Sequence, residues 1–273
     1  MQVAVITGAA SGIGAALAQE AVARGMHVVL SDRDAARLQA TADALGPQAL
    51  AVPCDVTDFA SVQALAERTY AAHGQVDFLF NNAGVLHTGS TWELPLATWQ
   101  QAWQVNVQGV VHGVHAFVPR LIAAQRPAHI VNTASMGGFV PSAMLPAYSA
   151  TKAAVVALTE SLLGELAQAA PPLKVSLLAP GPVHTALFDD PQAATANTSD
   201  YQAWMRDNTA KSGMPAAELA RLTWEAVLRG DYWILTHPQM FDMLWNQRNQ
   251  RIAARTSPLF QWTPQTVASA ENA

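Results

Sequence analysis

The sequence predicts an α/β fold: one domain with a doubly wound parallel sheet of about seven strands and helices on both faces. Short runs rich in Val, Leu and Ile recur along the 273 residues, as is typical of strands that are buried on both faces. Helix-like segments alternate with these runs, which favours parallel strands joined by right-handed crossovers. The chain is 51% hydrophobic and 13% charged, so it can bury a large core.

The predicted elements follow one another without a shift in composition. The strands cover residues 2–7, 27–31, 49–53, 77–80, 129–134, 174–179 and 232–236. The helices cover residues 13–24, 34–44, 59–73, 96–123, 148–168 and 216–229. Because no linker rich in Pro, Gly or Ser divides the chain, residues 1–273 are expected to form a single domain.

Two segments depart from the alternation. Residues 182–214 contain several Asp, Asn, Pro and Gly with poor periodicity, and they are predicted to form a mobile flap. Residues 237–273 carry Trp245 and Trp262 without a clear strand signal, and they are predicted to form a helical C-terminal extension.

Charge and cysteine content exclude several classes of partner. The formal net charge of −5 gives no electrostatic footprint for nucleic acid or an anionic membrane.

The single cysteine, Cys54, cannot form an internal disulfide, and no leader-length apolar segment precedes the strand that begins at Gln2. The cytoplasm is therefore the expected location. The polar residues between Arg126 and Lys152 argue against a membrane span there.

A glycine-rich turn joins the first strand to the first helix. In "TGAASGIG", residues 7–14, glycines stand at positions 8, 12 and 14. Glycine lets the backbone approach a ligand closely, and a helix N-terminus offers unpaired N–H groups and a partial positive charge. The turn therefore predicts a site for the diphosphate of a dinucleotide. The alternative is a glycine-rich turn that binds nothing.

Asp32 follows the second strand, 18 residues after Gly14. This is about the distance at which a carboxylate accepts a hydrogen bond from an adenosine ribose. Because Asp32 would repel a 2′-phosphate, NAD is expected rather than NADP, although the adjacent Arg33 could bind that phosphate. The alternative is that Asp32 is an ordinary turn residue.

Tyr148 and Lys152 stand four residues apart, with only Ser149, Ala150 and Thr151 between them. On a helix this spacing places the phenol and the ammonium on one face. His112 and His115 also lie close in sequence, but no carboxylate stands beside them, so we interpret them as packing residues and expect no metal site.

Together these motifs resemble the short-chain dehydrogenase/reductase family, in its single-domain Rossmann-type form. The resemblance extends from Gln2 to about Thr185, and its six features occur in the family's order. They are the glycine turn at 7–14, "NNAG" at 81–84, Asn106, Ser135 thirteen residues before the tyrosine, "YSATK" at 148–152 and "PGPVHT" at 180–185.

The resemblance implies a nicotinamide cofactor and four catalytic residues: Asn106, Ser135, Tyr148 and Lys152. Tyr148 would be the general acid/base and Ser135 would bind the same substrate oxygen. Lys152 would hold the nicotinamide ribose, and Asn106 an ordered water. The implied cofactor-binding residues are Gly8, Ser11, Gly12, Ile13, Gly14, Asp32, Arg33, Asp55, Val56, Asn82, Ala83, Gly84, Tyr148, Lys152, Pro180, Gly181, Val183 and Thr185.

Each of these polar residues also has a structural interpretation. Ser135 could be satisfied by backbone at a strand end, Asn106 could kink a helix, and Asp55 could cap the helix that follows it. For Tyr148, lowering the phenol pKa by roughly 3 units needs about 4 kcal/mol, which one ammonium at about 4 Å nearly supplies at an effective dielectric near 20. This estimate predicts a phenol made acidic by Lys152.

The residues beyond the motifs are expected to bind the substrate. Residues 136–145 and the side chains Leu187, Phe188, Trp204 and Met205 are mostly apolar, so a secondary alcohol or ketone with a bulky hydrophobic body is predicted. The resemblance implies a homodimer or homotetramer. The rival hypotheses are a dinucleotide-binding redox sensor or scaffold without turnover, and an epimerase or dehydratase that uses the same pocket.

Overall fold

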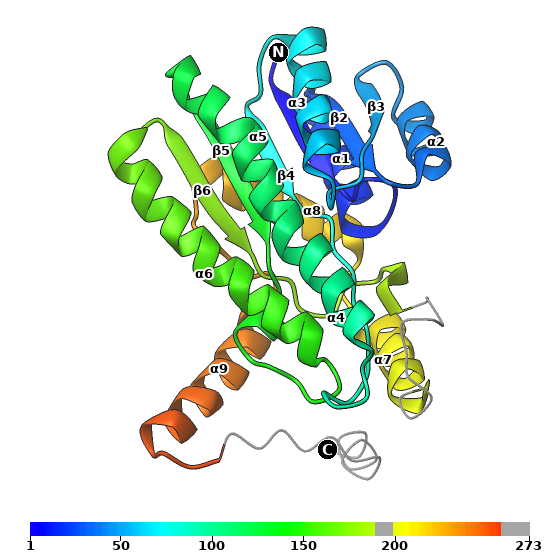
Figure 1. Cartoon of the computed structure of the whole chain (residues 1–273), viewed down its shortest axis with the longest axis vertical. Helices are drawn as coiled ribbons and strands as arrows, with labels where there is room; N and C mark the ends of the chain where they lie inside the picture. The colour runs from blue at the N-terminus through cyan, green and yellow to red at the C-terminus, as the bar shows by residue number, and fades with distance from the viewer. Residues whose placement is uncertain (189–198, 258–273) are drawn as a thin grey trace.

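The computed structural model describes residues 1–188 and 199–257, and its centre is a seven-stranded, wholly parallel sheet (Figure 1). The strand order is β3-β2-β1-β4-β5-β6-β7. The strands are β1 Val3–Thr7, β2 His27–Asp32, β3 Ala49–Pro53, β4 Phe78–Asn81, β5 Ala128–Thr133, β6 Leu173–Leu178 and β7 Trp233–Ile234. The predicted fold class and all seven predicted strands are confirmed, and no strand end differs from its predicted position by more than two residues.

Helices connect the strands and cover both faces of the sheet. They are α1 Gly12–Ala23, α2 Ala35–Leu45, α3 Phe59–His73, α4 Leu96–Trp103, α5 Gly109–Ala124, α6 Pro146–Ala169, α7 Ser199–Ser212, α8 Ala216–Arg229 and α9 Pro238–Ala253. The segment expected as one helix over 96–123 is α4 and α5 joined by a π-helical turn, η1 (Gln104–Gln108). Among the described residues, no helix is both long and apolar enough to cross a membrane.

Alternate residues of the strands form two separate cores. Ala4 and Ile6 of β1 face a cluster that includes Trp224 of α8, while Val3 and Val5 face a cluster with α3, α5 and α6. This is the period of two that a strand imposes on its side chains. Figure 1 shows α5 and α6 side by side in front of the sheet and α8 behind it.

The strand order reverses between β1 and β4, since β1 has β2 on one side and β4 on the other. In open α/β sheets, a ligand crevice forms outside the carboxyl ends of the strands at such a switch point. The turns after β1, β2, β4, β5 and β6 all end at this edge. These turns contain most of the residues that the sequence predicted to be functional.

Of the two segments outside the predicted alternation, the flap contains more helix than the sequence indicated. The predicted flap, 182–214, includes the short 3₁₀ helix η3 (Ala186–Phe188) and α7, and residues 189–198 lie outside the described structure. The C-terminal extension begins with α9, so its predicted helical character is confirmed over Pro238–Ala253. Trp262 lies outside the described residues.

Candidate active site

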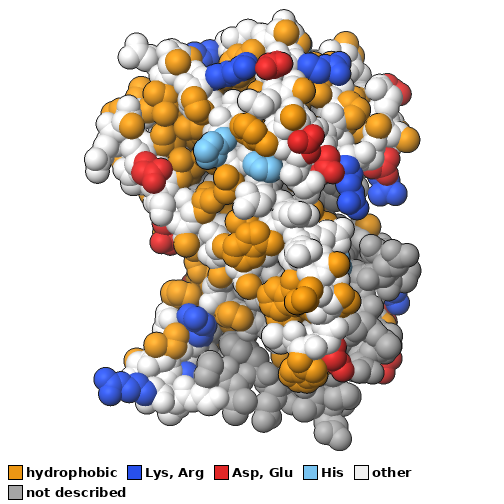
Figure 2. Space-filling model, viewed as in Figure 1, with side chains coloured by type: hydrophobic (Ala, Val, Ile, Leu, Met, Phe, Trp, Pro, Cys, Tyr) orange, Lys and Arg blue, Asp and Glu red, His pale blue; other side chains and the backbone are white. Residues whose placement is uncertain are grey.

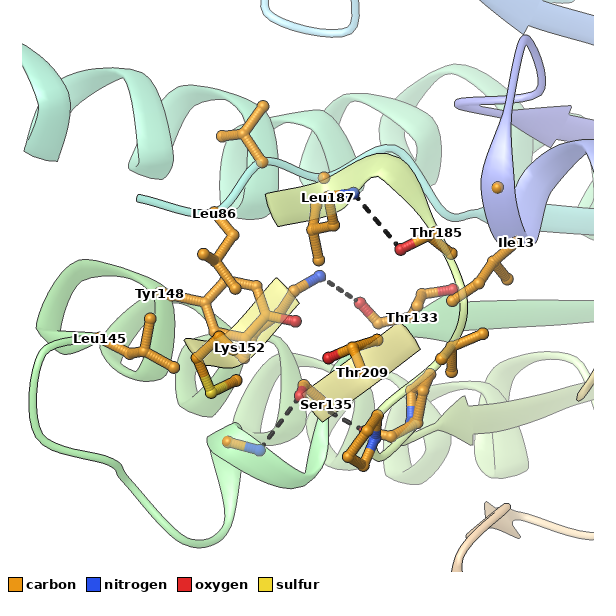
Figure 3. Close-up of a pocket in the computed structure, with 18 of the residues that line it drawn as sticks. Ile13, Leu86, Thr133, Ser135, Leu145, Tyr148, Lys152, Thr185, Leu187 and Thr209 are labelled. Atoms are coloured by element: carbon orange, nitrogen blue, oxygen red, sulfur yellow. Dashed lines mark hydrogen bonds between the residues drawn. The ribbon is translucent and has the colours of Figure 1, made fainter. Parts of the chain in front are cut away.

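One cleft of about 980 Å³ lies at the carboxyl edge of the sheet. It runs from the glycine turn past Tyr148 to α7, and Figure 3 shows its central part. Most of the predicted site residues line it: Gly8, Ser11, Gly12, Ile13, Gly14, Asp32, Arg33, Asn82, Ala83, Gly84, Ser135, Tyr148, Lys152, Pro180, Gly181, Val183 and Thr185. Three do not: Asp55, Val56 and Asn106.

The glycine turn is packed so tightly that side chains would not fit at two of its positions. Gly8 has φ +68°, and an added Cβ would lie 2.8 Å from the Ala83 Cα. At Gly14 an added Cβ would lie 2.1 Å from the Gly8 carbonyl oxygen. Ser11, at the N-cap of α1, makes no side-chain capping bond within the described chain. The N-terminus of α1 therefore faces the cleft with amide groups suited to a diphosphate.

Asp32 stands at the end of β2, in the wall of the cleft. Its two carboxylate oxygens accept hydrogen bonds from the Ala10 and Asp34 backbone N–H groups, at 3.2 and 3.1 Å. These bonds fix the carboxylate in place. Arg33 and Arg37 line the same wall, and Arg37 lies 3.7 Å from the Asp34 carboxylate.

Tyr148, Lys152 and Ser135 meet in the middle of the cleft (Figure 3). Tyr148 and Lys152 come from the first turns of α6, and the Lys152 Nζ lies 5.8 Å from the centre of the phenol ring. Lys152 is 3% exposed, and its Nζ donates to the Thr133 carbonyl at 2.8 Å. The Ser135 Oγ accepts from the Gly137 N–H at 3.1 Å. The predicted triad is thus brought together by β5 and α6.

Burial decides the protonation of this group. Burial raises the pKa of the Tyr148 phenol above its ordinary value, and the hydrogen bond with Ser135 partly offsets the rise. Burial also lowers the pKa of Lys152 to about 8. The prediction that the Lys152 ammonium makes the phenol acidic is therefore wrong for the chain by itself. That estimate counted the attraction between the charges and omitted the desolvation of both groups.

Two of the small residues between Tyr148 and Lys152, Ser149 and Thr151, are packed inside the protein. Ser149 is 4% exposed and Thr151 is fully buried. The Ser149 Oγ accepts from the Ser142 N–H at 3.4 Å, and the Thr151 Oγ1 accepts from the Asn106 Nδ2 at 3.0 Å. These contacts fix the rotation of α6 and thereby aim the phenol at the cleft.

Asn106 is fully buried within the π-helical turn and does not line the cleft. Its Oδ1 accepts from the Val85 N–H at 2.8 Å, and its Nδ2 donates to the Val85 carbonyl at 3.0 Å. With the bond to Thr151, both amide hydrogens are used. The side chain ties the segment after β4 to α6, so it acts on the cleft through structure.

Asp55 and Val56 also lie outside the cleft wall. The Asp55 Oδ1 accepts from the backbone N–H and the hydroxyl of Thr57, at 2.9 and 2.8 Å, in a local turn. Asp58, and not Asp55, caps the following helix α3. Val56 is 8% exposed, and its carbonyl lies 2.8 Å from the His112 Nδ1, which agrees with the packing role expected for His112.

The other end of the cleft is apolar and is closed by α7. Tyr148 packs in a cluster with Leu86, Leu145, Met144, Leu187, Tyr201, Trp204 and Met205. The predicted substrate residues Leu187, Trp204 and Met205 therefore do line the cleft, while the side chain of Phe188 is outside the described structure. Arg206 and Lys211 are exposed.

Two polar residues of α7 that belong to this end were not predicted from the sequence. Tyr201 is 3% exposed, and its hydroxyl interacts with that of Ser142. Thr209 is 3% exposed, and its Oγ1 has no hydrogen-bond partner in the described chain. Figure 3 shows the Thr209 hydroxyl directed into the cleft. A helical spacing of apolar residues over 199–212 would have indicated them, but the apolar stripe of this segment is weak.

The fold and the site together define a class of protein. A doubly wound sheet, a glycine turn suited to a diphosphate and a buried Tyr–Ser–Lys group beside an apolar pocket are the parts of a dinucleotide-dependent oxidoreductase.

Comparisons with known proteins agree with this class. The family model described as short chain dehydrogenase matches residues 2–195. A CLA biosynthesis dehydrogenase/reductase of Lactiplantibacillus plantarum is 32% identical over 272 residues, which cover 94% of this chain and 95% of that protein. A 1-deoxy-11-beta-hydroxypentalenate dehydrogenase of Streptomyces exfoliatus is 36% identical over 257 residues, covering 89% and 88%.

A solved structure shares the fold over nearly its whole length. The crystal structure of a short chain dehydrogenase/reductase from Burkholderia phymatum in complex with NAD has a TM-score of 0.91 and 36% identity, covering 96% of this chain and 98% of that one. This chain belongs to the short chain dehydrogenase family, and it is an oxidoreductase.

Proposed function

We propose that this protein is an NAD-dependent dehydrogenase that interconverts a secondary alcohol and the corresponding ketone. The observation that carries the proposal is the position of Tyr148, Ser135 and Lys152. They line the cleft midway between the glycine turn and the apolar pocket. A group bound at the turn and a molecule in the pocket would therefore meet at the phenol.

The residues of the cleft fit a dinucleotide. The N-terminus of α1 suits the diphosphate, Asp32 suits the adenosine ribose, and the residues 180–185 face the opposite end. The bound nicotinamide ring would accept or supply the hydride of the reaction. Lys152, with one N–H held by Thr133, has two further N–H groups that could bind the ribose hydroxyls beside it.

Tyr148 is the general acid/base of the proposed reaction. Since burial raises its pKa, the phenol holds its proton at neutral pH and can donate it to the oxygen of a ketone as that oxygen gains charge. Ser135 can donate a second hydrogen bond to the same oxygen. In the oxidation direction the phenolate must form, and the nearby Lys152 ammonium would then stabilise it.

The apolar wall supports a bulky hydrophobic substrate. Leu86, Leu145, Leu187, Trp204 and Met205 surround the phenol, and transfer of apolar surface from water would supply the binding energy. The names of the two relatives refer to a dehydrogenase/reductase of CLA biosynthesis and a dehydrogenase of a hydroxypentalenate, and both fit an alcohol or ketone with a bulky body.

One panel of substrates, assayed for turnover, product and dinucleotide binding, separates this function from its rivals. A panel of secondary alcohols is incubated with NAD and with NADP, and the reduced cofactor is measured. We expect turnover of the bulky apolar alcohols. We also expect a higher kcat/KM with NAD than with NADP, because the Asp32 carboxylate repels a 2′-phosphate. Tight dinucleotide binding without turnover of any alcohol or ketone would favour a sensor or scaffold. Product formed without stoichiometric NADH would favour an epimerase or dehydratase.

A homodimer or homotetramer in the cytoplasm is part of the same proposal. Large apolar side chains stand exposed on the face formed by α4, α5 and α6, including Trp103 (43%), Leu163 (37%) and Ile122 (36%), and Figure 2 shows apolar side chains gathered on this face. Such a surface is typical of an interface between subunits. Gel filtration with light scattering tests this part, and a monomer at micromolar concentration would contradict it.

A further inference from the structure

The turn formed by residues 180–185 is held in the cleft wall by separate parts of the chain. The Met136 N–H donates to the Pro180 carbonyl at 2.9 Å. The Met214 N–H donates to the Pro182 carbonyl, also at 2.9 Å. Both bonds join backbone groups, so no substitution removes them selectively. The Ser135 hydroxyl also donates to the Pro180 carbonyl at 3.5 Å, but Ser135 belongs to the proposed catalytic group. Among the described residues, one further side chain outside that group anchors the turn.

That anchor is His237, between β7 and α9. The Gly181 N–H donates to the His237 Nδ1 at 3.1 Å, and the Thr236 Oγ1 lies 2.9 Å from the same nitrogen. An Nδ1 that accepts carries no proton, so the ring proton is on Nε2. The ring also touches the turn directly, since a Cβ at Gly181 would lie 2.8 Å from the His237 Cγ.

We propose that His237 is a positioning residue for the cofactor: its neutral ring holds the Gly181 amide and thereby fixes the 180–185 turn against a bound dinucleotide. Val183 and Thr185 of this turn line the cleft, so a displaced turn changes the surface that the dinucleotide contacts. The inference rests on the proposed function, and it gives the start of the C-terminal extension a role in the cleft.

Three substitutions separate the hydrogen bond from the bulk of the ring. In His237→Asn, the Oδ1 can occupy the position of Nδ1 and accept from the Gly181 N–H. In His237→Gln, the polar atoms reach the position of Nε2 and leave that N–H without an acceptor. His237→Leu removes both positions and keeps an apolar side chain.

The test measures the Kd for NADH by fluorescence and the kcat and KM of an active substrate, with unfolding midpoints as a check on folding. We expect Kd to rise about tenfold in the Gln and Leu variants, because a buried N–H loses its partner. We expect the Asn variant to stay within about twofold of the wild type, because its Oδ1 keeps the partner. If the Leu variant does not fold, the comparison of the Asn and Gln variants, which are matched in polarity, still tests the proposal.

Equal Kd values for the Asn and Gln variants would overturn the inference, whether both bind well or both bind poorly. In that case the wild type still binds NADH, and the proposed function stands. A wild-type protein that binds neither NADH nor NADPH overturns the proposed function and this inference together.

Discussion

The protonation of Tyr148 and Lys152 follows from burial more than from their mutual attraction. An ammonium near a phenol stabilises the phenolate by Coulomb attraction, but removing both charges from water costs several kcal/mol. The pKa of Tyr148 is raised and the pKa of Lys152 is lowered to about 8. At neutral pH the pair therefore consists of a neutral phenol and a lysine that is largely protonated.

The first prediction concerns the phenol. Tyr148→Phe removes the hydroxyl and keeps the ring in its apolar cluster, so kcat should fall by at least about 10²-fold, the range of general acid–base catalysis. The Kd for NADH should change less than about threefold, because the ring still fills its place. Steady-state kinetics and fluorescence titration measure the two quantities. Turnover within a factor of two of the wild type would show that another group moves the proton.

The second prediction concerns Thr209, whose buried hydroxyl has no partner in the described chain. Thr209→Val keeps the shape and removes the unpaired polar atom, so the free protein should gain about 1 kcal/mol in the free energy of unfolding. Binding should weaken, with a Kd for NADH or a KM for the alcohol raised about tenfold, because the hydroxyl is directed into the cleft.

Thr209→Ser is the matched control for this prediction, since it keeps the hydroxyl. It should leave binding within about threefold of the wild type. A Val variant that changes neither unfolding nor binding would mean that the Thr209 hydroxyl neither destabilises the free protein nor contacts a bound ligand.

At the level of residues, motif order predicted the cleft wall better than individual roles. Tyr148, Ser135 and Lys152 were found because their order and spacing match the motifs of the family. Asp55 and Asn106 were not distinguishable from cleft residues by sequence. Neither lines the cleft, and only the packed fold shows that Asp55 bonds to Thr57 and Asn106 to Val85.

The elements of the sheet were predictable because their signal is local. Continuous Val, Leu and Ile runs identify strands buried on both faces, and all seven occur where expected. α7 was missed because its residues 199–212 are mostly polar, and its helix is stabilised by packing of Tyr201 and Trp204 on the cleft. The π-helical turn η1 was also missed; its Asn106 bonds to Val85 and Thr151, which lie far away in the sequence.

The third prediction concerns the turn between β1 and α1. In Gly14→Ala the added methyl would lie 2.1 Å from the Gly8 carbonyl oxygen, so α1 or the turn must shift. We expect a loss of about 2 to 3 kcal/mol in the free energy of unfolding and a loss of NADH binding at millimolar cofactor.

Gly164→Ala in α6 is the control, because an added Cβ there meets nothing within 4 Å. It should stabilise the protein by about 1 kcal/mol, the difference in helix propensity. If Gly14→Ala unfolds and binds NADH like the wild type, the turn is looser than its contacts indicate, and its role in diphosphate binding would be wrong.

For the whole molecule, the sequence predicted the architecture, because the alternation of strand and helix patterns is a local signal, but it did not predict the strand order. The strand β1 lies between β2 and β4, so the turns after these strands converge. Contacts between residues far apart in the sequence could not be predicted. For example, His237 at the start of α9 contacts the 180–185 turn, but no sequence pattern in either segment indicates this contact. The same limit applies to the buried hydrogen bonds between strands.

One such bond makes the stability of the molecule depend on pH. His129 of β5 is 4% exposed, and its Nε2 lies 2.7 Å from the Ser176 Oγ on β6. The Ser176 hydroxyl donates to the Asp231 carbonyl at 2.6 Å, so Nε2 carries a proton and donates to Ser176. Burial, together with the nearby Lys174, lowers the pKa of His129 to about 4, and the Val227 carbonyl offsets part of this shift.

The fourth prediction is that stability decreases as the pH falls from about 6.5, the pKa of an unfolded histidine, to about 4. In this range the unfolded chain binds a proton at His129 that the folded chain excludes, so acid favours unfolding. The contribution of His129 to the free energy of unfolding is fully present above pH 6.5. Its loss at acidic pH lowers the free energy of unfolding by about 3 kcal/mol. His129→Gln keeps a donor at the Nε2 position and cannot titrate, so it should lack this component. Urea unfolding of both proteins between pH 7 and pH 4 measures the difference, and parallel curves would show that His129 does not titrate with folding.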